Sequence, residues 1–325
     1  MIRFMVHKIA APSLALQPPP VQPSFEHSTP QTNPFHHIES PTERQFSNTE
    51  PHTIKRVSDF TNEETGRRPS FHIDANGNKT GVAKPYPRDS MMEPLVYQLS
   101  KHIAPGLVPT TVNRVHQTGP GTIEPHSVQQ YVEPHPDEAH YTDIRRHPDF
   151  PKIALLDYLT GNIDRHSGNV LHGKDDKLHA IDNGLAFDVQ HEPEDIKNGN
   201  VENFADYSRI AKNLKHAATN KHDIPQDMRQ NIANMHPEHY MPYFDQLHNH
   251  RFANTALSHS PLDWSEHGQQ FHDRVKTLQN HFADPNVKNM GDLYARLYPG
   301  SNYAIQHGRQ PAHGSPGFDG LGHRS

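Results

Sequence analysis

Cysteine is absent from the 325-residue chain. Its absence excludes disulfide bonds and zinc sites built on cysteine, and it gives no support to a secreted, disulfide-stapled design. Long hydrophobic runs are also missing, because no apolar stretch approaches the ~20 residues that a membrane helix requires. Lys8 and Pro12 interrupt the apolar residues of the N-terminus. We therefore expect neither a transmembrane segment nor a cleaved signal peptide.

A basic excess is lacking too, since the formal net charge is −6 with neutral histidine. No general attraction to nucleic acid is therefore predicted. Histidine is abundant instead, with 29 copies. Because the unperturbed histidine pKa is ~6.5, modest acidification would reverse the sign of the net charge. Pairs such as His236 with His239 match no zinc motif, so no structural metal is predicted.

Hydrophobic residues make up 32% of the chain, and its 30 prolines are spread widely. Such a composition favours one globular domain with disordered ends. We expect a proline-rich disordered tail at 1–52, a β-rich lobe at 53–132, a mainly helical lobe at 133–300 and a disordered tail at 301–325.

The stretch 155–187 carries three oxygen-bearing side chains at fixed intervals. Asp164 is followed by Asn169 five positions on, and Asp182 lies thirteen positions further. Phosphoryl transfer needs a group that orients an acceptor hydroxyl and groups that hold magnesium against the phosphates. An Asp can do the first, while Asn and Asp oxygens suit a hard cation. Taken singly, these residues could also be a helix cap and two turn residues.

The spacing resembles the protein-kinase signature, in which the last Asp belongs to D-F-G. Here that segment reads Ile181-Asp182-Asn183-Gly184, and Asp164-Arg165-His166 reverses the usual H-R-D order. The pattern N-x-D-R-H-x-x-N resembles bacterial proteins of the phosphatidylinositol 3/4-kinase-like group of atypical kinases. It is also similar to HipA-type and four-jointed-type kinases. The resemblance spans about 70–190.

The resemblance implies an α+β, protein-kinase-like fold with a small β-rich N-lobe and a mainly helical C-lobe. Its catalytic loop would lie within 161–187, with Asp164, Arg165 and His166 as catalytic residues. Arg165 would hold the loop in shape or contact the transferred phosphate, and His166 would support the loop through hydrogen bonds. Asn169 and Asp182 would hold Mg²⁺, and ATP would be the phosphate donor.

Upstream, 71–74 reads as a strand, 75–78 as a turn with an Asn-Gly hairpin signal, and 81–84 as the returning strand. Apolar residues then follow a helical period over 90–103, and Pro94 places the helix start nearby. The resemblance implies that Lys84 binds nucleotide phosphates. Glu93 could pair with Lys84 or close a capping box with Ser90, and we favour the ion pair.

Two further strands are predicted at 108–115 and 127–132. Periodicity alone indicates only that the second is buried. Its sequence, Ser-Val-Gln-Gln-Tyr-Val, resembles the hinge strand between the two lobes in this family. The backbone of that strand contacts the adenine ring. The resemblance thus assigns Gln130 and Val132 to nucleotide binding. A glycine-rich G-x-G-x-x-G motif is missing before Lys84, so phosphate-loop residues are not assigned.

Downstream, periodicity predicts a helix at 151–160, a hairpin formed by 169–172 and 177–181, and later helices at 201–217, 225–235, 269–282 and 289–298. The segment 188–206 holds six acidic residues and one lysine. Phosphorylated headgroups are bound by Arg and Lys, so this composition favours a protein or small-molecule acceptor over a phosphoinositide.

The sequence therefore predicts an ATP- and Mg²⁺-dependent kinase that phosphorylates a hydroxyl group of an unidentified acceptor. Three alternatives stay open: a phosphatidylinositol kinase, a kinase-like enzyme that transfers AMP, and an inactive pseudokinase that acts as a binding module. The expected location is cytoplasmic, or outside the cell as an exported bacterial effector.

Overall fold

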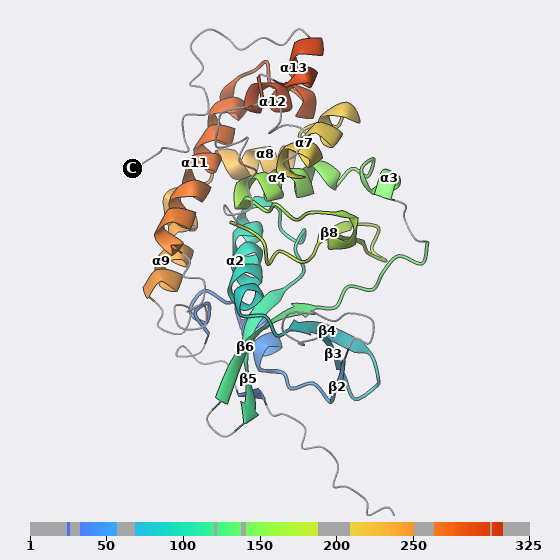
Figure 1. Cartoon of the computed structure of the whole chain (residues 1–325), viewed down its shortest axis with the longest axis vertical. Coiled ribbons are helices and arrows are strands. Elements are labelled where there is room, and N and C mark those ends of the chain that lie inside the picture. Colours follow the sequence, from blue (N-terminus) through green and yellow to red (C-terminus); the bar gives the residue numbers. More distant parts are fainter. Residues whose placement is uncertain are drawn as a thin grey trace, which may run out of the picture.

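The protein has two lobes, a sheet in the lower half of Figure 1 and a group of helices above it. A computed structural model describes residues 25–26, 33–56, 69–119, 122–137, 141–187, 209–249, 263–299 and 301–307. This arrangement confirms the predicted α+β fold with a small β-rich lobe and a mainly helical lobe. Within these ranges no helix is both long and apolar enough to cross a membrane.

Antiparallel strands form the sheet of the N-lobe, in the order β1-β5-β6-β4-β3-β2. The strands are β1 Phe25–Glu26, β2 Thr53–Arg56, β3 Ser70–Ile73, β4 Lys79–Lys84, β5 Thr111–Gly119 and β6 Thr122–Gln130. All four strands predicted between 71 and 132 exist. The third and fourth extend beyond the predicted limits because β5 and β6 pair with each other as one long hairpin.

The predicted Asn-Gly turn joins β3 to β4. Gly77 adopts a left-handed conformation with φ +83°, which glycine tolerates without steric cost. The Asp74 carboxylate accepts hydrogen bonds from the backbone N–H groups of Asn76 and Asn78 at 2.9 and 2.8 Å. These local bonds fix the register of β4, and so they fix where Lys84 leaves the sheet.

Helix α2, Pro87–Ile103, packs against β5 and β6 and lies between the two lobes (Figure 1). The expectation that Pro94 stands near its start was wrong, because the helix begins seven residues earlier. A proline inside a helix leaves the carbonyl four residues before it without a donor. Here the Asn113 side-chain amide donates to the Ser90 carbonyl at 2.8 Å. This bond replaces the missing one.

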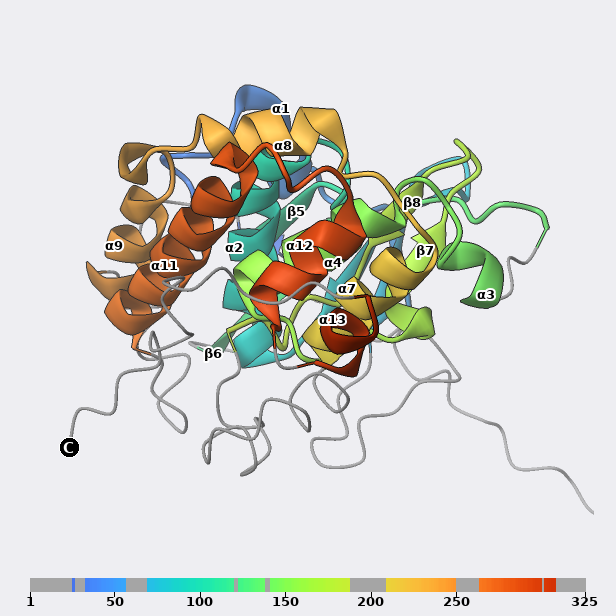
Figure 2. The same ribbon diagram turned by 90° about the horizontal axis from the view of Figure 1, so that it is seen from above.

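The helical lobe is built from mostly short helices that surround α4, Phe150–Thr160. The others in the described residues are α3 Tyr141–Ile144, α7 Arg209–Thr219, α8 Gln226–Ala233, α9 Met241–Asn249, α11 Trp264–Ala283, α12 Met290–Leu297 and α13 Asn302–Gln306. In the view of Figure 2, α12 lies in front of α4 and α11 runs to the left of it. The predicted hairpin is also present, as β7 Val170–His172 paired with β8 Leu178–Ala180.

Helix α4 is buried along almost its whole length and contacts α7 and α11. It ends at Gly161, whose φ of +62° reverses the chain into the following loop. The apolar residues that α7, α11 and α12 turn to the core are buried: Ile210, Leu214, Phe271, Val275, Leu278, Leu293 and Leu297. The helix expected at 201–217 begins at Arg209 in the described part, and its earlier residues lie outside that part.

The expected disordered tail at 1–52 needs correction. Helix α1, Pro41–Asn48, lies within it, and Phe35 is 1% exposed in the main core. Ser40 and Glu43 form a capping box that starts the helix, and the buried Glu43 carboxylate also accepts a hydrogen bond from Tyr97 of α2 at 2.6 Å. The proline content of this segment predicted disorder. The contacts that order it are made with residues far along the chain, which local composition does not report.

The expected C-terminal tail at 301–325 is partly structured as well. It begins with α13, Asn302–Gln306, where Ser301 and Ala304 are buried. The rest of this expectation, from residue 308 on, falls outside the described residues.

Candidate active site

Lys84 at the end of β4 forms an ion pair with Glu93 of α2, with 2.5 Å between Nζ and Oε1. Glu93 is fully buried, and Ser127 of β6 donates a hydrogen bond to its other oxygen. Burial raises the pKa of the Glu93 carboxyl, while the Lys84 ammonium opposes that shift. The ion pair that we favoured is therefore present, and the alternative capping box is not, because the N-cap of α2 is Tyr86.

The same Lys84 ammonium lies 2.9 Å from Asp182 Oδ1, so it joins β4 and α2 to the distant segment that carries Asp182. Burial acts to raise the pKa of Asp182, but the charge and hydrogen bond of Lys84, together with the charges of Arg165 and His166, bring the pKa below its ordinary value. The Asp182 side chain keeps 44% of its surface exposed. An ionised carboxylate that remains partly accessible can bind a cation.

The loop 162–169 follows Gly161 and presents Asp164 and Asn169. The Asn162 side chain accepts a hydrogen bond from the Asp164 N–H at 3.1 Å. The Asn169 amide nitrogen donates to the Asp164 carbonyl at 3.0 Å. That bond uses the nitrogen of the Asn169 amide, so its oxygen is the atom available as a ligand. The Ile181 N–H donates to the Asn169 carbonyl at 3.1 Å, which places the loop beside Asp182.

Arg165 is buried, with 2% of its surface exposed, and its bonds hold the loop together. Its Nε lies 3.1 and 3.2 Å from the two carboxylate oxygens of Asp157 on α4. One terminal nitrogen donates to the carbonyls of Asn169 and Ile181, and the other donates to the Asn183 side chain. Of the two roles considered for Arg165, holding the loop fits this geometry, and contact with a transferred phosphate does not.

Asp157 is the buried counter-charge of Arg165. Burial raises its pKa to about 6, and the adjacent guanidinium opposes the shift. Both partners are removed from water, so the loss of either one would leave an uncompensated buried charge.

His166 and Arg209 flank the Asp164 carboxylate. His166 Nδ1 accepts a hydrogen bond from the Gly168 N–H at 3.0 Å, and its Nε2 lies 3.9 Å from Asp164 Oδ2. Arg209, at the start of α7, approaches Asp164 Oδ1 at 3.3 Å. The predicted support of the loop by His166 is thus seen. No motif in the sequence indicates Arg209, which follows the catalytic loop by some forty residues.

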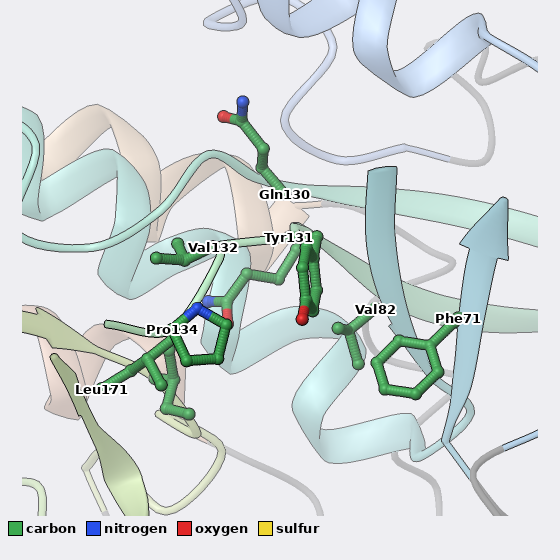
Figure 3. A pocket seen from close by; sticks show the side chains of 9 residues that line it. Phe71, Val82, Gln130, Tyr131, Val132, Pro134 and Leu171 are labelled. Atoms are coloured by element: carbon green, nitrogen blue, oxygen red, sulfur yellow. The ribbon is translucent and has the colours of Figure 1, made fainter. Parts of the chain in front are cut away.

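A cavity of about 280 Å³ opens between the sheet and the β7–β8 hairpin (Figure 3). Its walls are mainly apolar. They are formed by Phe71, Val82, Gln129, Gln130, Tyr131, Val132, Pro134, Leu171 and Ile181. Val132 and Gln130 were both predicted here, but the Gln130 side chain points away from the other labelled residues (Figure 3).

Backbone groups of the segment after β6 differ in what they bind. The Gln130 N–H donates to the Thr110 carbonyl at 2.7 Å, and the Tyr131 N–H donates to the Thr80 carbonyl at 3.0 Å. No described residue is bonded to the backbone of Val132. Val132 is therefore the better candidate for binding a planar heterocycle, and the assignment of Gln130 is weakened by its occupied N–H.

Arg88 in the first turn of α2 is a further residue that sequence reasoning missed. Its guanidinium donates to the carbonyls of Gly184 and Ala186 at 2.9 and 3.3 Å. It thereby ties the helix that carries Glu93 to the segment that follows Asp182.

Phe71 and Leu171, which form apolar walls of the cavity, were not predicted as site residues either. The alternation of strand residues indicates that a side chain is buried but not what lies against it.

The two lobes, the cavity between them and the shared ammonium of Lys84 define the class as a kinase-like protein. A family model described as phosphatidylinositol 3- and 4-kinase matches residues 72–261, more than half of the chain. The chain belongs to this family.

A search of solved structures adds a distant likeness to the crystal structure of the Golgi casein kinase. The two share 14% sequence identity with a TM-score of 0.47, over 78% of this chain and 79% of that one. None of the curated proteins searched matches the chain.

Proposed function

We propose that this protein is a phosphotransferase that moves the γ-phosphate of ATP to a hydroxyl group, with Mg²⁺ as cofactor. The observation that carries the proposal is the double contact of Lys84, which reaches Glu93 and Asp182 at once. Kinases use a strand lysine paired with a helix glutamate to hold the nucleotide phosphates, and an aspartate beside it to hold the metal. Family membership supports the same reaction class.

The donor nucleotide fits the cavity. Its apolar walls suit an adenine ring, and the Val132 backbone supplies polar groups at its edge. Lys84 would bind the phosphates, and the buried Glu93 would keep the ammonium in place. Because Glu93 is inaccessible to solvent, its role is to position Lys84 and not to touch the nucleotide.

Oxygen donors suited to Mg²⁺ converge beside Lys84. Asp182 contributes an ionised, partly exposed carboxylate, and Asn169 contributes the amide oxygen that its own hydrogen bond to Asp164 leaves available. Hard divalent ions prefer such oxygen ligands. Magnesium bound there would neutralise negative charge on the phosphates.

Asp164 is proposed to orient the acceptor hydroxyl and take its proton. Its carboxylate is 36% exposed, so a substrate can reach it, and Arg209 and His166 fix its orientation from two sides. Arg165 acts through the loop, as a positioning residue, because all its described bonds point into the protein.

The acceptor is proposed to be a protein or small molecule, because the acidic segment 188–206 would repel a phosphorylated headgroup. That segment lies outside the described residues. A phosphatidylinositol acceptor is the second candidate, and the family model favours it.

The decisive experiment measures nucleotide binding and phosphate transfer separately. Mg²⁺-ATP should raise the Tm of the wild type, and Asp182→Asn should abolish the Mg²⁺-dependent part of the rise. Asp164→Asn should keep the rise but lower transfer of labelled phosphate by about 10²- to 10⁴-fold, the usual contribution of a general base. Asp175→Asn, in the exposed β7–β8 turn, is the matched control and should resemble the wild type.

Transfer should be assayed with phosphatidylinositol vesicles, with protein mixtures and with the enzyme alone, so that the acceptor classes are distinguished. Product mass separates an added phosphoryl group from the heavier adenylyl group. Nucleotide binding without any transfer would indicate a binding module. If Mg²⁺-ATP far above typical affinities left the Tm unchanged, the proposal would fail.

A further inference from the structure

A group of metal-ligating side chains lies outside the proposed active site. It consists of His135 in the segment after β6, His172 at the end of β7 and Asp176 in the β7–β8 turn. One potential ligand atom from each lies within 4.8 Å of the other two. The imidazole rings of His135 and His172 stack with 4.5 Å between their centroids. Three strong ligand groups thus share one small region of the surface.

Backbone bonds hold these residues together independently of their side chains. The His135 N–H donates to the His172 carbonyl at 2.8 Å, and Pro134 forms an isolated β-bridge with Gly173. Asp176 adopts a left-handed conformation with φ +58°, which few residues other than glycine adopt. That conformation turns its carboxylate back to His172, with 3.0 Å between Oδ1 and Nε2.

One distance in the group is already close to that of a tetrahedral site. Zinc bonds of ~2.0–2.1 Å to nitrogen and oxygen place neighbouring ligand atoms about 3.3 Å apart. The pair formed by His172 and Asp176 is already near that separation. His135 is half-buried, and one of its ring nitrogens lies within 4.8 Å of the ligand atoms of both other residues. Its Nδ1 lies beside the backbone of Asp137, so Nε2 is the nitrogen available to a cation.

We propose that His135, His172 and Asp176 bind a divalent transition-metal ion of the Zn²⁺ type. A set of two imidazole nitrogens and one carboxylate oxygen suits Zn²⁺ better than it suits Mg²⁺. Three protein ligands leave a fourth position for water. It joins the segment after β6 to the β7–β8 hairpin, and both of these line the cavity.

A second histidine–aspartate pair in the same hairpin provides the comparison. His179 Nε2 lies 3.1 Å from Asp175 Oδ1, with the same four-residue spacing as His172 and Asp176. No third ligand joins this pair among the described residues. At the proposed site a further ring, His147, lies 5.5 Å from that of His172. Burial lowers the pKa of His147, so this ring adds no positive charge at neutral pH.

The test titrates the full chain with Zn²⁺ alone by calorimetry, beside the variants His135→Gln, Asp176→Asn and Asp175→Asn. Asn tolerates the left-handed conformation, and Asp176 is 82% exposed, so Asp176→Asn should fold normally. We expect one site that weakens at least about tenfold in His135→Gln and in Asp176→Asn and stays unchanged in Asp175→Asn. Zn²⁺ binding by the other histidines is the same in the wild type and the variants, so the comparison subtracts it.

Circular dichroism of each variant checks the fold before titration. An anomalous difference peak between the three ligands in crystals soaked with Zn²⁺ would support the site directly. Equal Zn²⁺ affinity in the wild type and both ligand variants would overturn the proposal, and so would an equal loss in Asp175→Asn.

Discussion

At the residue scale, the loop that carries Asp164 depends on one buried guanidinium. Arg165 bonds to Asp157, Asn169, Ile181 and Asn183, which belong to three separate parts of the chain: α4, the loop 162–169 and the segment 181–183. A planar guanidinium with five N–H donors can make all these bonds at once, and a lysine cannot. The identity of residue 165 is thus explained by the shape of the loop.

Asp157→Asn should destabilise the protein strongly. It leaves the Arg165 charge buried without its counter-charge, a change that typically costs 3–5 kcal/mol in proteins, here about 3 kcal/mol or more. Urea denaturation measures the loss. Glu133→Gln breaks the exposed pair with Lys174 and should cost less than about 1 kcal/mol. Equal losses for the two variants would contradict the role given to Arg165.

Acid stability should depend on His216. Burial and the nearby cations Arg145, Lys212 and Lys215 lower its pKa from 6.5 to about 4. The folded state therefore binds fewer protons than the unfolded state between pH 6.5 and 4, so the contribution of His216 to stability is complete above pH 6.5 and falls as the pH decreases.

Between pH 7.5 and 5.5, His216→Gln should remove about 1 kcal/mol of the acid-induced loss in the free energy of unfolding. Urea denaturation at both pH values gives the difference. His52→Gln, at an exposed position, should follow the wild type. A His216→Gln protein with an unchanged pH dependence would show that this imidazole does not resist protonation.

At the scale of elements, α2 connects the two halves of the site. It carries Glu93 for Lys84 and Arg88 for the segment after Asp182, and it packs against β5 and β6. A proline in such a helix is acceptable only because a neighbouring strand supplies the missing donor, from Asn113.

Asn113→Ala should cost about 1–3 kcal/mol, because it removes the amide that donates to the buried Ser90 carbonyl. Pro94→Ala in that background should recover about 1 kcal/mol, since an alanine N–H can donate to the same carbonyl. The two single variants and the double variant form a thermodynamic cycle measured by urea denaturation. If Pro94→Ala changed the free energy of unfolding equally in the wild type and in Asn113→Ala, the Asn113 amide would not be replacing the N–H that Pro94 lacks.

At the scale of the whole molecule, the N-terminal segment completes the N-lobe. Phe35 belongs to the main core, and Glu43 of α1 contacts Tyr97 and Lys101 on the helix that carries Glu93. β1 also pairs with β5 at the edge of the sheet. The described residues 33–48 are therefore part of the fold.

Phe35→Ala should lower the free energy of unfolding by about 3–5 kcal/mol, the usual cost of removing a buried phenyl ring. Thermal or urea denaturation provides the measurement. Gln45→Ala, on the exposed side of α1, should change stability by less than about 0.5 kcal/mol. A Phe35→Ala protein as stable as the wild type would mean that the segment does not contribute to the core.

The sequence alone determined the local features of this protein. The β3–β4 turn follows from Asn-Gly, the end of α4 follows from a glycine, and the buried faces of α7, α11 and α12 follow from apolar spacing. The pairing of Lys84 with Glu93 was also predicted, because the motif fixes the order of a strand and a helix that are neighbours in the chain.

Only the tertiary structure decided which distant residues share a surface. The counter-charge of Arg165, the place of Arg209 beside Asp164, the packing of Phe35 and the meeting of His135 with His172 all depend on chain segments that fold together. Periodicity reports whether a side chain is buried but not its partner, because burial is a property of one position and contact is a property of two. That is why the candidate site was predicted in outline and its supporting contacts were not.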